Sequence, residues 1–575
     1  MDAHKLPIPD IFNGSKLLEI PFFQRAYVWD KPQWERFLDD IETAIASNTP
    51  HFMGAVILKQ KPTSTSSTVG DIRTVIDGQQ RLTTLSILIK VLCLKTDTMR
   101  KFDKRFRLDD DRPVIQHNHN DIAAYEAIMN LDEPVATDKK DNISRCYQFF
   151  LDHLSPERTN FEQLLTNIFF VCIDLDANDD EQQIFDTINS LGVRLTTAEL
   201  LKNYFFGRSD LDLFNRYWVD IFEKDDDTKA YWDQEITTGR MKRSFIDQFF
   251  FSYLQIKLQD KSLNLSTEKK IEFSKVDRLF DSYKQFIQIC FDGNKHAVLE
   301  ELQEYALIFK RIFNPALVNE ELSAASNLER LNVIIFGLDT TTLIPYVLFI
   351  EHSVSDDTEK NDLYSYLESY IMRRIVTRQT TKNYNQLFSD RLILNRILTK
   401  QELIEYLASQ DDKINRMPTD SEVRAGFHES TLTNKYAAGV LYLIESRIRN
   451  QRLYSTQLLG LGKYSLEHLM PKKWHNHWTI EASSITADDR DRILLTLGNL
   501  TLITQNLNAS IRDADWDTKK SGKGSHDGLK NYAAGLEIFS KYLEEPVWNE
   551  ATIMARAEDL AEKALSVWST SNSPS

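Results

Sequence analysis

Residues 75–85 read Val-Ile-Asp-Gly-Gln-Gln-Arg-Leu-Thr-Thr-Leu, and they decide the fold of the first part of the chain. The β-branched run that ends at Ile76 predicts a buried strand, and the apolar run from Leu82 to Leu94 predicts a helix. Gly78 lies between the two, where a residue without a Cβ atom permits a tight turn. The stretch therefore predicts a strand, a turn and a helix with a polar start.

The sequence on either side of this stretch predicts a mixed α/β domain. Asp30 and Pro32 are start signals for an amphipathic helix, and Thr196 with Glu199 forms a capping box before another. The loop 61–70, rich in Ser and Thr, would join two strands into a hairpin. Strands are expected at 15–20, 54–58, 72–76 and 168–175, and a helix at 183–188. We place the end of this domain at residue 207.

The remainder of the chain is predicted to be mostly helical. From 208 to about 430 apolar residues recur at helical spacing, and Pro and Gly are sparse. A last domain is placed at 431–575, with a disordered tail over 569–575. The predicted fold class is thus α+β and mostly helical, with domains at 1–207, 208–430 and 431–575.

Composition limits the classes of protein to which the chain can belong. It has 575 residues, a formal charge of −16 and 42% hydrophobic residues, which argues against a wholly disordered chain and against a uniformly basic coat for nucleic acid. A local basic groove stays open. The four cysteines form no CxxC pair, as expected of buried free thiols in a reducing cytosol. No signal peptide and no apolar run of about 20 residues is seen, so we expect a cytoplasmic protein without a membrane span.

The polar turn at 77–81 suggests phosphate chemistry. A helix N-terminus offers unpaired N–H groups and a positive dipole end to an anion. Arg81 can bond to phosphate, and Asp77 can hold a metal ion or a water molecule. An ordinary polar cap with an ion-paired arginine is the competing interpretation.

Residues 21–29 form a second polar cluster, in which Gln24 and Arg25 lie among aromatic residues. Arginine and aromatic rings together can grip a nucleotide by phosphate contact and base stacking. A core aromatic cluster with one exposed arginine would give the same pattern.

These two stretches resemble the GmrS-like half of GmrSD-type restriction enzymes, in the ParB/sulfiredoxin-like superfamily. A third matching stretch covers 185–195 and 199–203, with Leu191 where the family often has arginine and with Arg194 nearby. The resemblance implies nucleotide binding and hydrolysis, with Asp77 and Arg81 catalytic. The residues implied in nucleotide binding are Gln24, Arg25, Asp77, Gly78, Gln79, Gln80 and Arg81.

The last domain contains a second chemical pattern. Glu467 and His468 set an acidic metal ligand beside a general base, the pair that metal-assisted phosphodiester cleavage needs. Asn499 and Asn508 follow across a predicted strand and turn, where one can orient the His468 ring and the other can bind the metal. Ordinary turn and cap residues would give the same spacing.

This pattern resembles the GmrD-like HNH (His-Me finger) nuclease domain. The matching pieces are 467–471 (Glu-His-Leu-Met-Pro), 498–500 (Gly-Asn-Leu), Asn508 and Lys519 or Lys520. The resemblance implies a ββα-metal finger, with His468 as general base, Glu467 and Asn508 as metal ligands and Asn499 orienting the base. Residues 475–477 read His-Asn-His, but consecutive residues cannot supply the finger geometry, so a surface loop is expected there.

Basic residues near the second pattern suggest where DNA would bind. Lys472 and Lys473 follow His468, and Lys519 and Lys520 open a Gly- and Ser-containing stretch with further lysines. A second cluster, formed by Arg373, Arg374, Arg378 and Lys382, is as compatible with a solvated charged face as with DNA contact.

The two resemblances together imply a type IV, modification-dependent restriction endonuclease in one chain. Its expected cofactors are Mg²⁺ or Mn²⁺ and a nucleoside triphosphate (ATP, GTP, UTP or CTP). Its expected partner is double-stranded phage DNA with hydroxymethylated or glucosylated cytosine, and a homodimer would let two HNH sites cut both strands. The alternatives are a phosphorothioate-sensing nuclease, a nucleotide-switched DNA-binding regulator with an inactive nuclease domain, and a hydrolase of the nucleotide pool.

Overall fold

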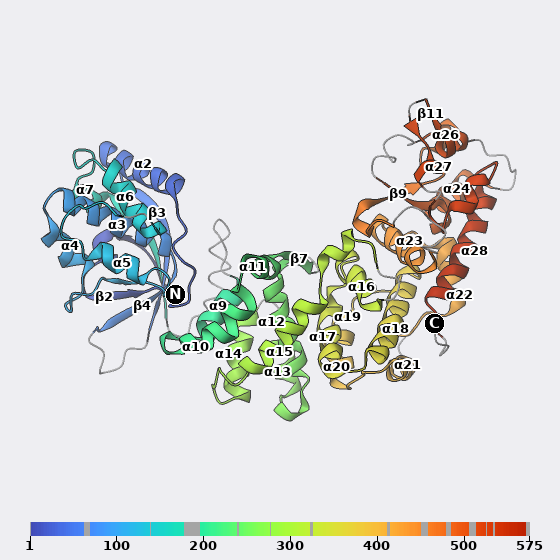
Figure 1. Ribbon diagram of the computed structural model, residues 1–575, viewed down its shortest axis with the longest axis horizontal. Helices are drawn as coiled ribbons and strands as arrows, with labels where there is room; N and C mark the ends of the chain where they lie inside the picture. The colour runs from blue at the N-terminus through green and yellow to red at the C-terminus, as the bar shows by residue number, and fades with distance from the viewer. Residues whose placement is uncertain are drawn as a thin grey trace. The chain divides into compact units, whose positions relative to one another are not determined.

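The computed structural model divides the chain into two compact units. The first contains 1–220 and 277–296, and the second contains 221–276 and 297–575 (Figure 1). The structure describes the following residues: 2–61, 69–137, 140–176, 196–238, 241–275, 278–322, 326–410, 414–449, 458–478, 485–504, 513–524, 526–532 and 535–570. The helix predicted at 183–188 lies outside them. Segment 277–296, which the sequence analysis gave to the helical connector, belongs to the first unit.

A mixed six-stranded sheet forms the centre of the first unit. Its spatial order is β1-β6-β3-β4-β2-β5. Strands β3 and β4 pair antiparallel, as the predicted hairpin requires, whereas β3 with β6 and β2 with β4 are parallel. The strands are β1 (Asp2–Pro7), β2 (Lys16–Glu19), β3 (His51–Gln60), β4 (Asp71–Asp77), β5 (Ile115–Gln116) and β6 (Ile168–Leu175). The four strands expected from the sequence are confirmed.

Helices pack around this sheet, and α3 (Gln79–Lys95) is the central one (Figure 1). Every residue of α3 from Leu82 to Leu94 is buried, which explains its apolar run. The other helices of the unit are α1 (Ile8–Ile11), α2 (Lys31–Ser47), α4 (Met99–Phe106), α5 (Ile122–Met129), α6 (Asn142–His153), α7 (Phe161–Asn167), α9 (Thr197–Phe205), α10 (Leu211–Phe214) and α14 (Leu279–Cys290). Capping boxes open α2 at Asp30 and α9 at Thr196, so both predicted helix starts are confirmed.

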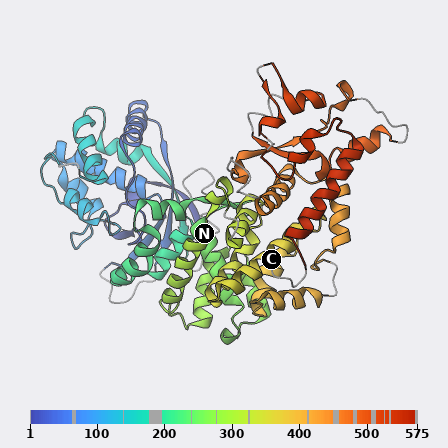
Figure 2. The ribbon, with the colours of Figure 1, turned by 45° about the vertical axis from the view of Figure 1, so that its right-hand side comes forward.

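The second unit is mainly helical, as predicted for this part of the chain. Its helices are α11 (Asp226–Asp233), α12 (Phe245–Leu258), α13 (Thr267–Phe273), α15 (Leu299–Ile312), α16 (Asn327–Asn332), α17 (Ile344–Ser353), α18 (Asp357–Val376), α19 (Tyr384–Gln386), α20 (Leu392–Leu394), α21 (Lys400–Ala408), α22 (Asp420–Glu429), α23 (Asn434–Ile448), α24 (Ala487–Ile493), α26 (Trp516–Ser521), α27 (Leu529–Tyr532) and α28 (Glu550–Val567). Helices α22 and α28 lie side by side in both ribbon views (Figures 1 and 2).

Short strands and turns complete the described part of the chain. Three two-stranded sheets are formed by β7 (Glu235–Thr238) with β8 (Met241–Ser244), β9 (Tyr464–His468) with β10 (Leu500–Thr504), and β11 (Gly522–Lys523) with β12 (His526–Asp527). The 3-10 turns are η1 (Arg208–Asp210), η3 (Lys261–Leu263), η5 (Pro315–Asn319), η7 (Thr341–Leu343), η9 (Leu461–Lys463), η10 (Trp474–Asn476), η11 (Leu497–Asn499) and η12 (Ser540–Glu544). The π-helical turns are η2 (Asn215–Glu223), η6 (Val333–Gly337) and η8 (Leu387–Arg391). The β7–β8 hairpin was not foreseen in a stretch predicted as helical.

Buried arginines hold the helices of the second unit together. Arg330 forms a two-bond ion pair with Glu368, and both side chains are almost fully buried. Arg373 is buried as well and donates to the carbonyl oxygens of Pro418 and Trp568. Arg374 donates to Thr380 O. Arg373 and Arg374 are therefore structural, whereas Arg378 and Lys382 of the same predicted cluster are exposed.

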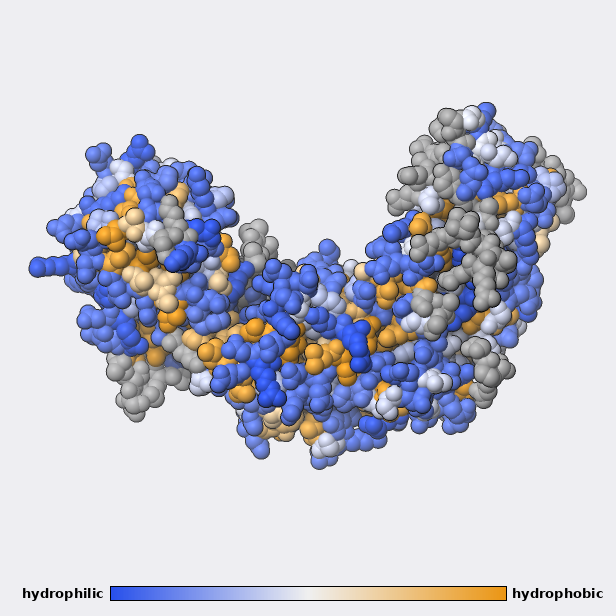
Figure 3. Space-filling model, in the orientation of Figure 1, coloured by the Kyte–Doolittle hydropathy of each residue, from blue (hydrophilic) through white to orange (hydrophobic). Residues whose placement is uncertain are grey.

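The surface of each unit is mainly polar. In the view of Figure 3, hydrophilic side chains cover most of the described face of both units. Within the described residues, no helix is both long and apolar enough to span a bilayer. Cys93, Cys146 and Cys172 are buried free thiols, and Cys290 is a partly buried one.

Candidate functional site

The turn between β4 and α3 has the tight geometry that the sequence predicts. Gly78 adopts a φ of +98°, in the left-handed region, and precedes the first turn of α3. A Cβ atom at this position would lie 2.9 Å from Cγ2 of Val56 on β3. Because that contact is closer than any real Cβ makes, only glycine fits here. The turn therefore brings the polar start of α3 against β3.

Arg81 is fixed by two acceptors at this turn. Its Nη2 atom donates to Asp77 Oδ2 at 2.9 Å and to the carbonyl oxygen of Ala55 at 2.6 Å. Both side chains of the ion pair are about one quarter exposed. The buried Nε atom of Arg81 has no hydrogen-bond partner among the described residues. The pairing matches the ordinary-cap interpretation, but one donor remains unused.

The two glutamines of the turn hold the segment that contains the second polar cluster. Gln80 Oε1 accepts from the backbone N–H groups of Val28 and Trp29, at 3.0 and 3.3 Å. Gln79 Nε2 donates to the carbonyl oxygen of Arg25 at 3.2 Å. Gln79 Oε1 is buried and lacks a partner in the described part of the chain. The structure thus brings the two predicted clusters together through side chain to backbone bonds.

Gln24 and Arg25 differ in their surroundings. Gln24 is buried, and its Oε1 atom accepts from Asn203 Nδ2 at 2.9 Å, which ties the segment to α9. The guanidinium of Arg25 is partly exposed and has no partner among the residues that the structure describes. Arg25 therefore stays available for an anion. The remainder of the third matching stretch, 185–195 with Leu191 and Arg194, lies outside the described residues.

Residues 117–121 form hydrogen bonds to the segment that contains Gln24 and Arg25. The sequence analysis did not predict these residues as part of the site. Asn118 Nδ2 donates to the Arg25 carbonyl oxygen at 3.2 Å, and Asp121 Oδ2 accepts from Tyr27 N at 2.6 Å. Burial raises the pKa of Asp121. Full burial lowers the pKa of His117 to about 3, so this imidazole is neutral. The polar run His-Asn-His-Asn-Asp at 117–121 was the sequence signal that could have pointed to these residues.

The second candidate site lies on the β9–β10 hairpin. The two strands pair antiparallel, with His468 opposite Leu500 and Glu467 opposite Thr501. His468 ends β9 and is partly exposed. Its pKa is lowered to about 4, first by burial and then by the positive charges of Lys472 and Lys519. The imidazole is therefore neutral near pH 7, the form that accepts a proton.

Lys519 does not face DNA, and this prediction is wrong. Its side chain is fully buried in α26, where it forms an ion pair with Glu467 and donates to His468 O at 2.7 Å. Burial raises the pKa of Glu467 and lowers that of Lys519, and the attraction between the two charges opposes both shifts. The lysine thus joins α26 to β9 beneath His468.

Asn499 holds the backbone that follows His468 instead of the His468 ring. Its Oδ1 atom accepts from Met470 N at 2.8 Å, and its Nδ2 atom donates to Met470 O at 2.8 Å. Trp548 Nε1 also donates to Oδ1, at 3.1 Å. Asn499 is fully buried, and the bonds of its side chain within the described residues are all to these groups and Leu494 O. The expectation that its amide orients the imidazole directly is therefore corrected.

A divalent metal ion would find a partial set of ligands here. Mg²⁺ prefers oxygen ligands and keeps several waters, so few protein ligands suffice. Glu467 supplies a carboxylate, and Asp513 is close enough to raise its pKa further. Asn508 lies outside the described residues, and within them no group of three His, Cys, Asp or Glu side chains could hold a metal. The Glu467 carboxylate is already paired with Lys519, so a hard ion here would be bound mostly by water.

The other predicted DNA-binding lysines fall into two classes. Lys472 and Lys473, four and five residues after His468, are exposed. Lys520 is largely buried, with Nζ 3.2 Å from Glu545 O and 5.7 Å from the centre of the Trp516 ring. His475 and His477 are exposed around the short turn η10, in agreement with the surface position expected for them.

Comparison with protein families identifies both halves of the chain. A model of the GmrSD restriction endonuclease N-terminal domain matches residues 8–206, and a model of the GmrSD restriction endonuclease C-terminal domain matches residues 417–563. Together the two ranges cover more than half of the 575 residues. No curated protein matches the chain. The chain therefore belongs to the GmrSD restriction endonuclease family, the type IV restriction nucleases, and contains both characteristic domains of that family.

Proposed function

We propose that this protein is a nucleotide-stimulated, metal-dependent endonuclease that cleaves phage DNA with hydroxymethylated or glucosylated cytosine. The observation that carries the proposal is the placement of His468. It ends a strand whose neighbour begins at the Gly-Asn-Leu motif, and it is partly exposed while the residues around it are buried. A general base needs this combination of a fixed backbone and an accessible ring. The proposal assigns the hairpin to an HNH-type finger.

The metal ion in this proposal is Mg²⁺ or Mn²⁺. Glu467 and Asn508 would hold it, with water completing the shell. When bound, the ion would stabilise negative charge on the leaving oxygen of the cleaved phosphodiester. His468 would take the proton from the attacking water. The buried side chains of Lys519 and Asn499 would keep β9 and the following turn in place for that transfer.

The first unit would bind and hydrolyse the nucleoside triphosphate. The N-terminus of α3 follows the Gly78 turn and offers its N–H groups to phosphate. Three groups beside it support this assignment because they have no partner among the described residues. They are the guanidinium of Arg25, Gln79 Oε1 and Arg81 Nε. Asp77 and Arg81 remain the proposed catalytic pair, and ATP, GTP, UTP and CTP remain candidates.

DNA would contact the second unit near His468 through exposed lysines. Lys472 and Lys473 lie on the turn that follows His468 and can neutralise phosphates of the DNA. A homodimer would bring two such sites to the two strands of one duplex. With a net charge of −16, general attraction to DNA is weak, so local contacts would decide which DNA is bound.

The test is cleavage of matched duplexes of one sequence, with unmodified, hydroxymethylated or glucosylated cytosine. Each is incubated with the full chain, Mg²⁺ and each of the four nucleotides in turn. We expect strand breaks only in modified DNA, and faster breaks with one or more nucleotides. Equal cleavage of the unmodified duplex, or cleavage of a phosphorothioate duplex alone, would contradict the proposed substrate.

A DNA-binding regulator with an inactive nuclease domain is the second candidate. It is favoured by the buried ion pair of Glu467 with Lys519, because that pairing occupies the proposed metal ligand. The two candidates separate in the same assay. Nucleotide-dependent binding of modified DNA without strand breaks, in Mg²⁺ and in Mn²⁺, would establish the regulator.

A further inference from the structure

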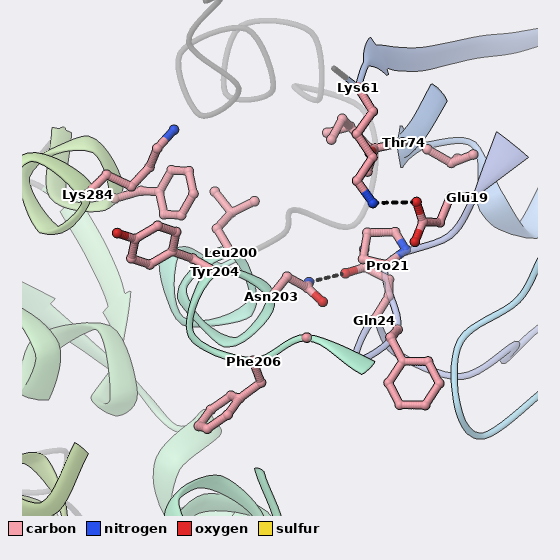
Figure 4. A pocket seen from close by; sticks show the side chains of 15 residues that line it. Glu19, Pro21, Gln24, Lys61, Thr74, Leu200, Asn203, Tyr204, Phe206 and Lys284 are labelled. Atoms are coloured by element: carbon pink, nitrogen blue, oxygen red, sulfur yellow. Dashed lines mark hydrogen bonds and ion pairs between the residues drawn. The ribbon is translucent and has the colours of Figure 1, made fainter. Parts of the chain in front are cut away.

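The second unit contains a cavity that neither family match reaches. It has a volume of about 410 Å³ and lies among α12, α15, α17 and α20, which pack against their neighbours in this group (Figure 1). All its lining residues fall between 256 and 396, whereas the first match ends at 206 and the second begins at 417. The larger cavity of the first unit, drawn in Figure 4, is lined by Gln24 and Asn203 of the matched motifs and belongs to the site already described.

The two carboxylates at this second-unit cavity are already satisfied. Lys257 Nζ donates to Glu301 Oε1 at 3.0 Å and to Asp260 Oδ2 at 3.2 Å. Glu301 Oε2 accepts from Tyr253 Oη at 2.8 Å. Asp260 Oδ1 accepts from Ser262 N at 2.9 Å. One lysine thus neutralises both acids in part, and each carboxylate oxygen has a donor.

Two positive charges at the same cavity have no counter-charge. Lys261 in η3 and Arg396 just after α20 are both exposed, and neither has a carboxylate partner in the part of the chain that the structure describes. The guanidinium of Arg396 lies 5.6 Å from the centre of the Phe349 ring. With histidine counted as neutral, the lining side chains carry three positive and two negative charges. The surplus favours an anion.

Tyr305 of α15 adds a buried hydroxyl to this set. Its side chain lines the cavity, is 3% exposed and stacks on His352, with ring centres 4.1 Å apart. Its Oη atom forms no hydrogen bond within the described residues. Burial and two nearby carboxylates raise the pKa of Tyr305, and the charge of Arg396 opposes that rise, so the guanidinium lies near this hydroxyl. A buried hydroxyl without a partner is costly, and an anionic oxygen would accept from it.

The free groups at the cavity favour a phosphate over other anions. A guanidinium, an ammonium and a hydroxyl all donate, and a phosphate monoester offers them several oxygens and up to two negative charges. Ile393 and Leu394 of α20 and Phe349 of α17 supply apolar surface beside these donors. The volume lies within the range of about 300–1,000 Å³ that is typical of sites for small organic molecules.

We infer that this cavity binds a small organic phosphate. The phosphate group bonds to Arg396, Lys261 and the Tyr305 hydroxyl, and the organic part lies on Ile393 and Leu394. Because these donors come from α15, η3 and the segment after α20, a bound ligand would stabilise the packing of the connecting helices. The site is separate from the Gly78 turn and from His468, so the inference does not rest on the proposed function.

The test is calorimetric titration of the full chain with phenyl phosphate, inorganic phosphate and benzoate. Arg396→Asn, Lys261→Gln and Tyr305→Phe each remove one proposed donor. Arg378→Asn is the matched control, because Arg378 is also exposed, has a φ of +53° against +50° for Arg396, and does not line the cavity. Tyr305→Phe removes only a hydroxyl without a partner in the described residues, so it keeps the test valid if a charge variant fails to fold.

We expect a phenyl phosphate site for which inorganic phosphate competes and which binds benzoate at least tenfold more weakly. Arg396→Asn should weaken phenyl phosphate binding by about tenfold or more, since it removes a charged donor. Lys261→Gln and Tyr305→Phe should each weaken it by about threefold or more. Arg378→Asn should stay within twofold of wild type. Phosphate bound at the Gly78 turn would be unaffected by all four substitutions.

Several outcomes overturn the inference. If wild type binds no phenyl phosphate, or if none of the three cavity variants weakens its binding, the cavity binds no organic phosphate. Equal affinity for benzoate would assign a carboxylate ligand instead. If Arg396→Asn and Lys261→Gln weaken binding of duplex DNA and leave phenyl phosphate binding unchanged, the two cations contact DNA. None of these results bears on the cleavage of modified DNA, which is measured separately.

Discussion

The two candidate sites use their predicted polar residues in different ways. At the Gly78 turn, Gln79 and Gln80 bond to backbone atoms and join two motifs, and several polar atoms stay unpartnered among the described residues. On the β9–β10 strand pair, Glu467 and Lys519 satisfy each other in a buried ion pair, whereas His468 is partly exposed. If both sites act as proposed, the first would share its ligand contacts among many groups, whereas the second would depend on one ring. Single substitutions should therefore act gradually at the first site and abruptly at the second.

The largest expected effect is that of His468→Ala. If the ring is the general base, DNA cleavage falls by on the order of 10²–10⁴-fold, because proton transfer from water loses its acceptor. Nucleotide hydrolysis stays within twofold of wild type, since the Gly78 turn belongs to the other unit. Single-turnover cleavage and phosphate release measure the two activities. His475→Ala, at an exposed histidine nearby, is the control, and equal loss of both activities in His468→Ala would contradict separate sites.

Next in size is the loss of the buried ion pair in Lys519→Met. Removing one partner of such a pair leaves the other charge buried and alone, which destabilises by about 3–5 kcal/mol. We expect amide hydrogen exchange in β9 and α26 to speed up accordingly. Lys523→Met, at an exposed lysine in the same stretch, should leave exchange unchanged. If Lys519→Met showed normal exchange but a lower salt dependence of DNA binding, Lys519 would contact DNA after all. That result would contradict the conclusion drawn from the burial of Lys519.

A smaller effect is expected for Gln80→Ala at the first site. The substitution removes the acceptor of two backbone N–H groups, on Val28 and Trp29, at a cost of about 1–3 kcal/mol. Exchange of these two amides should accelerate, and nucleotide affinity should fall because the Gln24–Arg25 segment loses its support. Gln80→Glu keeps an acceptor and should lie between wild type and Gln80→Ala. Unchanged exchange in Gln80→Ala would mean that the segment is held by other contacts.

Much of the first unit could be predicted from sequence because its signals are local. Alternation and apolar runs fixed the strands, and Asp30 and Thr196 marked helix starts through their own side chains. The return of α14 to this unit could not be foreseen, since its amphipathic pattern fits any apolar partner. The β7–β8 hairpin was missed although the sequence has a turn signal there, Gly239 between two short runs.

Site residues were harder to assign, because motif and spacing do not reveal burial. Lys519 and Lys472 are both lysines beside the Glu-His pair, yet only the structure shows that the first is buried under β9 and the second is exposed. Asn499 was placed near the correct strand end, but its amide faces Met470 instead of the imidazole. A sequence motif thus located the site, whereas the direction of each side chain depended on tertiary packing.

The last prediction concerns the pH dependence of stability that His117 gives to the first unit. Its pKa is about 3 in the folded chain and about 6.5 when unfolded, so the unfolded state binds an extra proton between these values. Stability of the first unit is therefore full above pH 6.5 and falls as pH decreases, by up to about 1.4 kcal/mol per pH unit. The neighbouring carboxyl of Asp121, 3.9 Å away, has a raised pKa and acts in the opposite direction near its own titration, so the slope is best read above pH 5. Hydrogen exchange of α3 at pH 5–7, corrected for its intrinsic pH dependence, measures that slope. His117→Gln should flatten it, and an equal slope in that variant would assign the acid sensitivity to another group.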